Sequence, residues 1–361
     1  MDPITPNAAR KGRGALSNAT GRFEPAERIA IDDGWGSADE PAPPLATTLT
    51  IDSTRTIIAR NDSPDIGFDR SINPYRGCEH GCVYCFARPT HAYLGLSPGL
   101  DFESRLFVKP EAAKLLTEEL RKPGYVCRPM AMGTNTDPYQ PTERKLGITR
   151  SILEVLQATD HPVCIVTKSA LIQRDIEILS AMAAKHLATV TISVTTLDRG
   201  LARRLEPRAA TPQRRLETIA ALAAAGIPTG VLAAPMIPAL NDAELEAILA
   251  AAKAAGAAHA GYVLLRLPRE LKGLFREWLE AHMPDRAKHV MSLVAAMHGG
   301  RSYDSRWGQR MTGSGPQAEL LRNRFELACR RLGLEHRGNP AKLDTTLFRP
   351  PERDGDQLRL L

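Results

Sequence analysis

The stretch Arg76-Gly77-Cys78-Glu79-His80-Gly81-Cys82-Val83-Tyr84-Cys85 carries three of the six cysteines of the chain. They are separated by three residues and then by two, so their thiolates can converge on a single metal centre. A cubane iron–sulfur cluster usually takes four protein cysteines, and three leave one iron open to another ligand. An open coordination position distinguishes a catalytic metal site from a closed structural one. The spacing of this cysteine loop (residues 76–85) therefore favours a catalytic iron–sulfur site.

Two other interpretations of these cysteines stay open on the sequence. One is a zinc site completed by His80, His91 or Cys127, which paired CxxC units or an HxxxH motif would support, and the sequence has neither. The other is disulfide bonding. Cysteines this close together in a cytosolic chain tend to be ligands, and we expect no secretory signal because the first residues lack a charged-then-apolar pattern.

The composition is that of a globular protein with a sizeable core, since 43% of the 361 residues are hydrophobic. No apolar run approaches the roughly 20 residues that cross a bilayer. We therefore expect a cytoplasmic monomer with reduced thiols and no contact with a membrane. The net charge of +6 and a pI of about 9.0 permit nucleic-acid binding without establishing it. The basic segment Arg301–Arg310 contains Tyr303 and Trp307, which can stack on bases, and a solvated loop is the alternative.

Changes in composition divide the chain into four parts. Residues 1–45 are rich in Gly, Pro, Ala and charge, and we expect a disordered tail. Residues 46–69 contain two runs rich in β-branched residues, which predict a short β extension. A strand–helix alternation occupies residues 70–285 and predicts the core. Residues 286–361 form a C-terminal extension of loops and one helix, over 317–332.

Six strand–helix units follow one another in the core, which predicts a parallel sheet with helices outside it. The strands are expected at 71–75, 130–134, 163–167, 188–194, 229–233 and 261–265. In the fourth strand Val190, Ile192 and Val194 alternate with polar residues, so one face packs on helices and the other lines a polar interior. A closed eight-stranded barrel instead fills its centre with branched apolar side chains. We therefore predict an α/β fold, a partial (β/α)6 TIM-like barrel around a ligand cavity.

Two helices of the core carry sequence signals for their bounds. Thr211 is the expected N-cap of a helix over 212–225, which begins with proline and is followed by glycine. Asn241 with Glu244 three residues later fits a capping box at the start of another helix. One helix is expected over 143–157.

Polar residues follow several strands at their C-terminal ends, where ligands bind in parallel βα folds. Gly133 ends the second strand and permits a close backbone approach, and Thr134 begins a polar run that can hold a zwitterion. Lys168 ends the third strand and suits a carboxylate, and Ser193 of the fourth strand lies in the same layer. Arg208 belongs to a group of arginines, one of which can take a carboxylate or phosphate bidentately. The structural alternatives are an Asx-type turn and solvated basic side chains.

The cysteine loop resembles the signature of the radical S-adenosylmethionine (SAM) superfamily, in which an aromatic residue, here Tyr84, precedes the last cysteine of a CxxxCxxC motif. Other segments resemble the spore photoproduct lyase branch of that superfamily. These segments are 133–137, 166–169, Ser193, 224–228 and 235–238. The whole chain is similar to a bacterial group within this branch that is often labelled DNA repair photolyase-like.

This resemblance implies a radical SAM enzyme with a (β/α)6 core and two cofactors. Three cysteines, Cys78, Cys82 and Cys85, hold a 4Fe-4S cluster whose fourth iron is chelated by SAM. The residues expected to bind the cofactors besides them are Tyr84, Gly133, Thr134, Lys168, Ser193 and Arg208. An electron donor such as flavodoxin or ferredoxin reduces the cluster, and SAM is cleaved to a 5′-deoxyadenosyl radical that abstracts hydrogen from substrate. The sequence does not identify that substrate, and nucleic acid is one candidate.

The resemblance also implies how SAM lies in the site. Its methionyl amino group is expected near Gly133 and Thr134. Its carboxylate is expected on Lys168 and its ribose near Ser193.

One departure from the branch leaves the lyase-like subclass open. Spore photoproduct lyases carry a hydrogen-donating cysteine at the end of the second-strand segment, where this chain reads Met130-Ala131-Met132-Gly133-Thr134. Cys127 precedes that strand, and we expect it toward the opposite end of the barrel from the chemistry. Tyr139, in the loop after the strand, is the better-placed catalytic residue if the protein supplies a hydrogen donor.

The rival function is a non-catalytic nucleic-acid-binding protein with a structural zinc or iron–sulfur site. Its working surface would be the basic segment 301–310. The polar strand ends favour the enzyme, because a structural metal site gives them no role. Cluster absorbance near roughly 400 nm would distinguish the enzyme from a colourless zinc protein.

Overall fold

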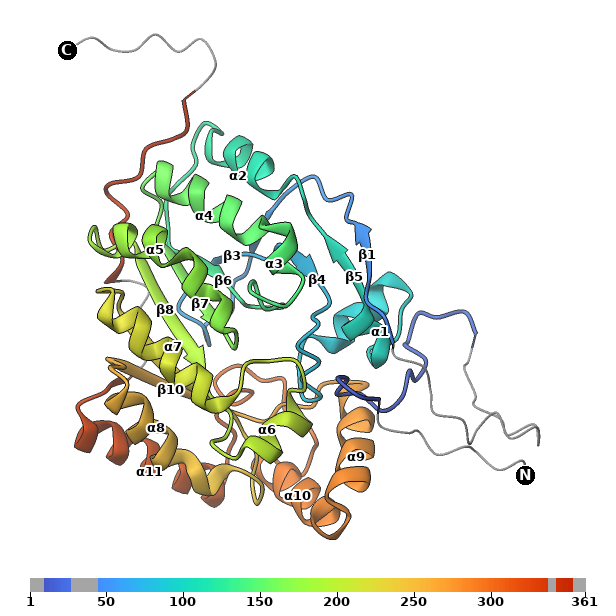
Figure 1. Cartoon of the computed structure of the whole chain (residues 1–361). Coiled ribbons are helices and arrows are strands. Elements are labelled where there is room, and N and C mark those ends of the chain that lie inside the picture. The colour runs from blue at the N-terminus through green and yellow to red at the C-terminus, as the bar shows by residue number, and fades with distance from the viewer. Residues whose placement is uncertain (1–9, 27–44, 337–341, 353–361) are drawn as a thin grey trace, which may run out of the picture.

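The computed structural model describes residues 10–26, 45–336 and 342–352 (Figure 1). Its main sheet contains β2 Ile58–Arg60, β3 Arg70–Ile72, β6 Met130–Met132, β7 Val163–Thr167, β8 Ala188–Ser193, β9 Thr229–Met236, β10 His259–Leu264 and β11 Glu335–His336. The strand order is β11-β10-β9-β8-β7-β6-β3-β2. β2 runs antiparallel to β3, and the other neighbouring pairs are parallel. The central strands β3, β6, β7, β8, β9 and β10 are the six that the sequence predicts, which confirms the α/β fold of a partial barrel.

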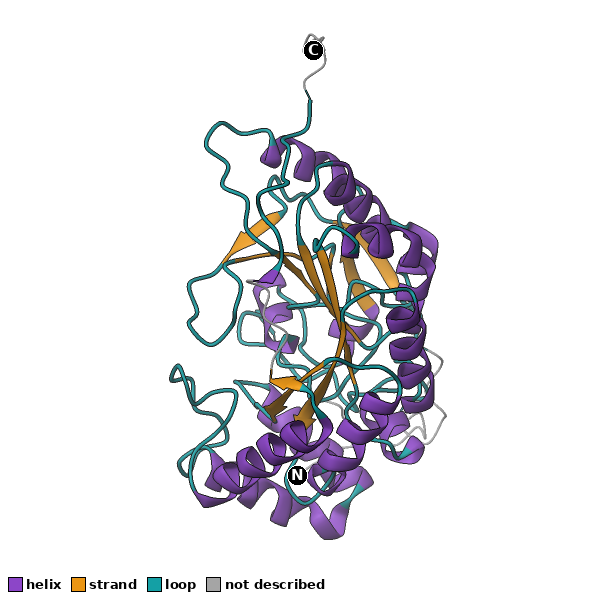
Figure 2. Cartoon of the chain, turned by 90° about the vertical axis from the view of Figure 1, so that its left-hand side faces the viewer, coloured by secondary structure: helices purple, strands orange, loops and turns teal. Residues whose placement is uncertain are grey.

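Helices cover one face of this sheet, and loops lie on its other side (Figure 2). In chain order the helices are η1 Arg88–Leu94, α1 Leu100–Ser104, α2 Ala112–Leu120, α3 Glu143–Leu146, α4 Ile148–Ala158, η2 Ala170–Asp175, α5 Ile176–Ala183, α6 Arg199–Leu205, α7 Pro212–Ala224, η3 Asp242–Glu244, α8 Leu245–Ala254, α9 Leu271–His282, α10 Pro284–Met297 and α11 Pro316–Leu332. Within the described ranges, no helix is long and apolar enough to cross a membrane.

The two faces of the sheet differ in burial as the strand alternation predicts. On the outer face, Val190 and Ile192 of β8 are fully buried beneath the helices. On the inner face, Thr189 and Thr191 of the same strand are only half-buried, and so is Cys164 of the neighbouring β7. The inner face is therefore polar and partly open, as expected of a sheet that curves around a cavity.

The structure divides the predicted helix 143–157 into α3 and α4. The break is at Gly147, which has a φ of 66°. Glu143 supplies the physical reason, because its carboxylate accepts the N–H of Thr149 at 3.0 Å and pairs with Arg174 at 2.8 Å. A buried side chain from the preceding turn therefore satisfies the free N–H groups at the start of α4.

The two predicted N-caps have different outcomes. Thr211 is confirmed, because its hydroxyl accepts the N–H three residues later at 3.3 Å. The capping box of Asn241 and Glu244 is wrong. Asn241 donates to the carbonyl of Thr195 at 2.7 Å, and Glu244 accepts the N–H of Leu197 at 2.6 Å. Both side chains therefore fix the segment that leaves β8 at its C-terminal end.

The N-terminal region contains a second sheet, with β1 Thr48–Ile51, β4 Tyr75–Arg76 and β5 Arg105–Val108 in the order β1-β5-β4. Both β1 and β2 fall inside the predicted β extension 46–69. The disordered tail expected over 1–45 lies partly outside the described residues. For residues 10–26 that expectation is wrong, because Leu16 and Ser17 are buried against the rest of the protein.

The C-terminal extension completes the main sheet. α11 confirms the predicted helix 317–332, and its buried residues include Leu321 and Phe325. After it, β11 adds a parallel edge strand beside β10, which the sequence did not predict. Phe348 then packs its ring 5.4 Å from the ring of His161, which precedes β7. The part of the extension that follows α11 thus runs along the N-terminal ends of the strands, away from the cysteine loop.

Candidate active site around the cysteine loop

The three loop cysteines lie directly after β4 and are free thiols. Cys78 and Cys82 are buried, and Cys85 is half-buried. Burial raises the pKa of Cys78 well above its ordinary value, and the nearby Asp137, Cys82 and Cys85 raise it further. Cys85 packs against the buried cluster that contains Cys78 and against the one that contains Cys82, so the three thiols lie in one region of the structure.

A zinc site gathers its donors around one ion, whereas a cluster distributes its thiolates over several irons. In the described parts of the chain, no three His, Cys, Asp or Glu side chains surround one metal-ion position. Of the proposed zinc ligands, His80 faces Asp137 with Nδ1 3.3 Å from the carboxylate, and His91 bonds the carbonyl of Arg105 at 2.9 Å.

Cations near the loop favour the thiolate form of its cysteines. Burial raises the pKa of Cys85, while the backbone N–H of Ala87 and the charges of Arg88, Lys168 and Arg266 act in the opposite direction. A metal ligand must be the thiolate, so these charges lower the cost of binding.

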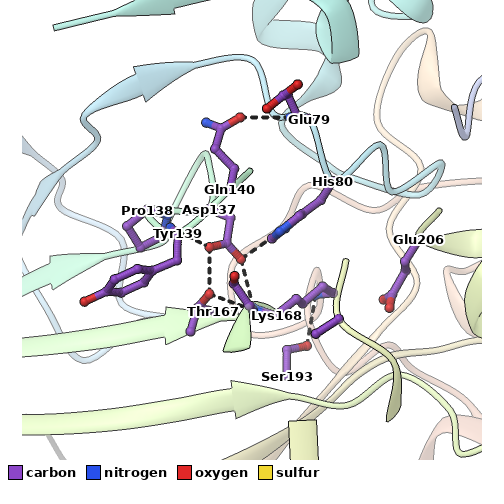
Figure 3. Close-up of polar contacts among 12 residues, drawn as sticks. Glu79, His80, Asp137, Pro138, Tyr139, Gln140, Thr167, Lys168, Ser193 and Glu206 are labelled. Atoms are coloured by element: carbon purple, nitrogen blue, oxygen red, sulfur yellow. Dashed lines mark hydrogen bonds and ion pairs between the residues drawn. The ribbon is translucent and has the colours of Figure 1, made fainter. Parts of the chain in front are cut away.

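Asp137 joins the cysteine loop to the strand ends (Figure 3). It follows β6, and one carboxylate oxygen accepts the hydroxyl of Thr167 at 2.6 Å. The other accepts the N–H of Lys168 at 2.8 Å and faces His80 of the cysteine loop. Burial alone would raise the pKa of Asp137, but these partners lower it to about 2. The carboxylate therefore stays ionised and holds the loop against β7.

Lys168 and Ser193 come together as the predicted layer requires, and Tyr84 lies beside them. The ammonium of Lys168 donates to the hydroxyl of Ser193 at 2.9 Å. The same nitrogen lies 5.8 Å from the centre of the Tyr84 ring. A lysine ammonium has three donors, so donors remain for a ligand beside the cysteine loop.

Glu206 holds Tyr84, the aromatic residue of the cysteine loop, in place. Its fully buried carboxylate accepts the hydroxyl of Tyr84 and pairs with Arg215. Burial raises the pKa of Glu206, but Arg215 and Lys168 reverse this, so the net pKa is lowered. Arg215 also donates to the carbonyl of Ser193 at 3.0 Å. One buried ion pair therefore sets the positions of Tyr84 and Ser193 together.

Gly133 and Thr134 lie at the C-terminal end of β6, as predicted. Gly133 has a φ of 87°, and a Cβ here would lie 1.9 Å from the carbonyl oxygen of Val166. The close approach that requires glycine is therefore to the neighbouring strand β7. The hydroxyl of Thr134 hydrogen-bonds the amide of Asn73 at 3.1 Å.

The structure pairs Arg208 with the cysteine loop and encloses Tyr139 in the core. Arg208 pairs with Glu79 of the cysteine loop at 3.1 Å, so it braces the loop. Tyr139 is fully buried in the main core, with its ring 6.0 Å from the guanidinium of Arg174. It points away from Lys168 in Figure 3. The expectation of a catalytic Tyr139 is therefore corrected, because the ring has no surface to offer a substrate.

Cys127 lies where the sequence argument expects it. It precedes β6, whereas Gly133 follows that strand. Arg70, the first residue of the parallel neighbour β3, lies close enough to lower the pKa of Cys127 against the effect of burial. Both observations place this thiol at the N-terminal ends of the strands.

Two residues that organise the site were missed from the sequence. Asp137 belongs to the polar run after the second strand, and Glu206 stands two residues before Arg208. Acidic side chains are mostly exposed, so composition gives no reason to select them. The position of Asp137 after a strand was the available signal, whereas Glu206 follows α6 and no strand end marks it.

Comparisons with known proteins agree with this geometry. A sequence model of the Radical SAM superfamily matches residues 72–252. Uncharacterised proteins of Mycobacterium tuberculosis and Mycobacterium bovis are 36% identical over 284 residues, which is 78% of this chain and 80% of theirs. An uncharacterised protein of Methanocaldococcus jannaschii is 25% identical over 173 residues, or 48% of this chain and 62% of that protein.

Solved structures of spore photoproduct lyase share the fold. A point variant of that enzyme matches with a TM-score of 0.57 and 17% identity, over 80% of this chain and 81% of the other. A structure of spore photoproduct lyase complexed with dinucleoside spore photoproduct matches with a TM-score of 0.53 and 16% identity, over 80% of each chain. At such identities the likeness concerns the fold alone. The superfamily match and the mycobacterial relatives, together with the cysteine loop, show that this chain belongs to the radical SAM superfamily.

Proposed function

We propose that this radical SAM enzyme holds a 4Fe-4S cluster on its three loop cysteines and binds the carboxylate of SAM through Lys168. The observation that carries the proposal is the position of the Lys168 ammonium, which Ser193 holds at 2.9 Å and which lies above the ring of Tyr84. It has donors to spare at the C-terminal ends of the strands, where parallel α/β folds bind ligands. When bound, the cluster and SAM supply a 5′-deoxyadenosyl radical.

The surrounding residues orient the cofactors. Ser193 is the proposed neighbour of the ribose, and its backbone is fixed by Arg215. The backbone around Gly133 and Thr134 lies at the same edge of the sheet and is proposed to receive the methionyl amino group. Tyr84 offers only the face of its ring, because its hydroxyl is committed to Glu206.

The described residues favour a site in which the protein donates no hydrogen atom. Tyr139 is enclosed in the core, and Cys127 lies at the other end of the strands. We therefore propose that the hydrogen returns from deoxyadenosine or that the reaction ends differently, so no lyase activity is assigned. A flavodoxin or ferredoxin is the proposed electron donor, and six free cysteines are in keeping with a reducing cytoplasm.

Anaerobic reconstitution with iron and sulfide, followed by reduction in the presence of SAM, tests the proposal. Wild type should form 5′-deoxyadenosine. Lys168→Ala should keep its iron but lose roughly ten- to a hundredfold in SAM cleavage at low SAM, the value of a charged hydrogen bond. The control is Lys185→Ala, a surface lysine paired with Asp160 at 2.7 Å, which should behave as wild type. Colourless protein with stoichiometric zinc would contradict the proposal and support the non-catalytic rival.

Nucleic acid is the substrate class that we propose for this site. A cavity of about 250 Å³ is lined by His298, Gly299, Arg301, Asp304 and Arg306, and Trp307 nearby is exposed. Asp304 pairs with Arg306 at 2.6 Å, so Arg301 is the basic side chain offered to a phosphate. The segment 298–306 that lines this cavity begins at the C-terminal end of β10, where His298 hydrogen-bonds the carbonyl of Leu265 at 2.9 Å. The solved spore photoproduct lyase with a bound dinucleoside photoproduct is in keeping with this class.

Fluorescence anisotropy with a labelled oligonucleotide tests the substrate class separately. Binding should weaken as salt rises, and Arg301→Ala should reduce the slope of log affinity against log salt by about one. Trp307→Ala should cost roughly 1–3 kcal/mol if its ring stacks on a base. Binding that is insensitive to salt would contradict a phosphate contact at this loop.

A further inference from the structure

Glu103 of α1 is a fully buried carboxylate at the edge of the cysteine loop. One of its oxygens accepts the N–H of Gly14 at 2.9 Å, and the other accepts the N–H of Ala15 at 2.8 Å. The guanidinium of Arg88, also fully buried, pairs with the same carboxylate. A segment near the N-terminus is thus bound through its backbone to a charge inside the protein.

Arg88 connects this carboxylate to the cysteine loop itself. Its guanidinium donates to the carbonyl of Cys82 at 2.9 Å and to that of Gly81 at 3.1 Å. Further donors reach the carbonyls of Pro98 at 3.0 Å and Gly99 at 2.8 Å. Since Cys82 is a proposed iron ligand, any shift of Arg88 is transmitted to the backbone that carries it.

The N-terminal segment also touches the cysteine loop directly. A Cβ on Gly14 would lie 1.8 Å from the carbonyl oxygen of Gly81 and 3.3 Å from the nitrogen of Val83. On the other side, a Cβ on Gly99 would lie 2.2 Å from the carbonyl oxygen of Ser17. Backbone packs on backbone at both places, which leaves no room for water between them.

Side chains at both ends of the segment hold it in place. Arg13 is buried, and its guanidinium donates to the carbonyl of Glu103 at 2.6 Å and to the hydroxyl of Thr47 at 3.1 Å. Asn18 and Asp101 exchange two hydrogen bonds, each of 2.9 Å. Polar contacts of this number and burial are typical of an ordered structural element.

We propose that residues 13–18 form a strap that closes the outer side of the cysteine loop, with Glu103 and Arg88 as its positioning residues. The strap holds the backbone of Gly81 and Cys82 in the geometry that binds the cluster and keeps water from that side. This role rests on the proposed function, because it requires the loop cysteines to hold a cluster. The strap lies outside residues 72–252, which match the superfamily.

Hydrogen–deuterium exchange on the cluster-free protein tests the strap itself. The amides of Gly14 and Ala15 should exchange slowly in wild type and rapidly in Glu103→Gln, which removes one acceptor and the charge. Glu143→Gln is the matched control, because Glu143 is equally buried, accepts the N–H of Thr149 at 3.0 Å and pairs with an arginine. It should leave both amides protected. Rapid exchange of these amides in wild type would overturn the strap.

Cluster retention tests the role of the strap. Glu103→Gln and Gly14→Ala should lose cluster roughly 10- to 100-fold more readily to a chelator or air than wild type, the usual cost of changing a residue behind a metal ligand. They should also shift the electron paramagnetic resonance signal of the reduced cluster. Gly273→Ala is the glycine control, since a Cβ there meets open space, and with Glu143→Gln it should show neither change.

The outcomes separate the two proposals. The positioning role alone would be overturned if the strap amides are protected in wild type but Glu103→Gln changes neither cluster retention nor the spectrum of the reduced cluster. A wild-type protein that takes up no cluster would overturn the proposed function and, with it, this role. Faster cluster loss in Glu143→Gln as well would show a general effect of stability and would also contradict the positioning role.

Discussion

Cysteines occur at both ends of the sheet, and only one group is placed for chemistry. Burial raises the pKa of Cys82, at the C-terminal ends of the strands, to about 12, and it raises that of Cys164, within β7, to about 12 as well. Burial therefore does not distinguish them. At Cys82, Glu206 and Cys85 raise the pKa further while Lys168 and Arg215 lower it, whereas at Cys164 only its own backbone acts besides burial in the described structure. The difference teaches that a candidate ligand is recognised by the charged neighbours at the strand ends and not by the burial of its own thiol.

The largest effect should come from removing a loop thiol. We expect Cys82→Ala to lose the cluster, because a cluster with only two protein ligands in this loop is poorly held. Cys164→Ala and Cys329→Ala should keep full iron, since free buried cysteines act as small hydrophobes. Iron and sulfide analysis after anaerobic reconstitution measures the difference. Full iron in Cys82→Ala would erase the contrast between the two groups.

Asp137→Asn should weaken the same end of the sheet by a smaller amount. The amide replaces one of the two oxygens that accept from Thr167 and Lys168, so at least one buried donor loses its partner. The free energy of unfolding should fall by about 1–3 kcal/mol, because the substitution weakens the contact through which Asp137 joins His80 to β7. We expect lower but measurable iron content and a reduced melting temperature. Thr189→Ser, a half-buried change on the inner face, is the control that should alter neither.

A change at the N-terminal ends of the strands should alter how stability depends on pH and should leave the iron content unchanged. Burial lowers the pKa of His161 from 6.5 to about 4 in the folded protein. The unfolded chain then binds more protons between these values, so this contribution is complete above pH 6.5 and is lost as pH falls toward 4. The loss amounts to about 3 kcal/mol. In His161→Phe, the free energy of unfolding relative to wild type should rise by that amount from pH 7 to pH 4.

Denaturant unfolding at several pH values measures this difference. His91, whose pKa burial also lowers to about 4, is present in both proteins and so cancels. The iron content of His161→Phe at pH 7 should equal that of wild type. A parallel pH dependence of the two proteins would show that His161 is not the group that titrates.

The sequence predicted those parts of the molecule that are repeated or periodic. The third strand occupies Val163–Thr167 as expected, because β-branched residues predominate there and polar residues follow. Lys168 and Ser193 meet because consecutive parallel strands end at the same edge. Residues 13–18 have no such period, and they are held by backbone N–H groups on a carboxylate 88 and 89 residues away. Nothing in a local pattern indicates that contact.

The sequence also could not predict which side chains of the loop after the second strand face the site. Asp137 and Tyr139 are two residues apart, and both were part of the polar run that follows the second strand. The N–H of Tyr139 bonds the carboxylate of Asp137 at 2.9 Å, and this turn directs Asp137 toward the cysteine loop and Tyr139 into the core. Which side chain faces the site depends on partners from β7 and η2, which pack only in the folded protein.

The smallest effect should come from Cys127, although it is the spare thiol nearest to the second strand. Cys127 precedes β6 and Gly133 follows it, and six steps of extended chain span up to about 20 Å. Direct hydrogen transfer needs reacting atoms about 3–3.5 Å apart. We therefore expect Cys127→Ala to keep its cluster, its rate of 5′-deoxyadenosine formation and, once the substrate is known, its products. Chromatography of the reaction mixture would reveal the opposite: an intact cluster and intact SAM cleavage with product diverted to adducts. That result would make Cys127 the hydrogen donor, restore the lyase interpretation and remove the contrast between the two ends of the sheet.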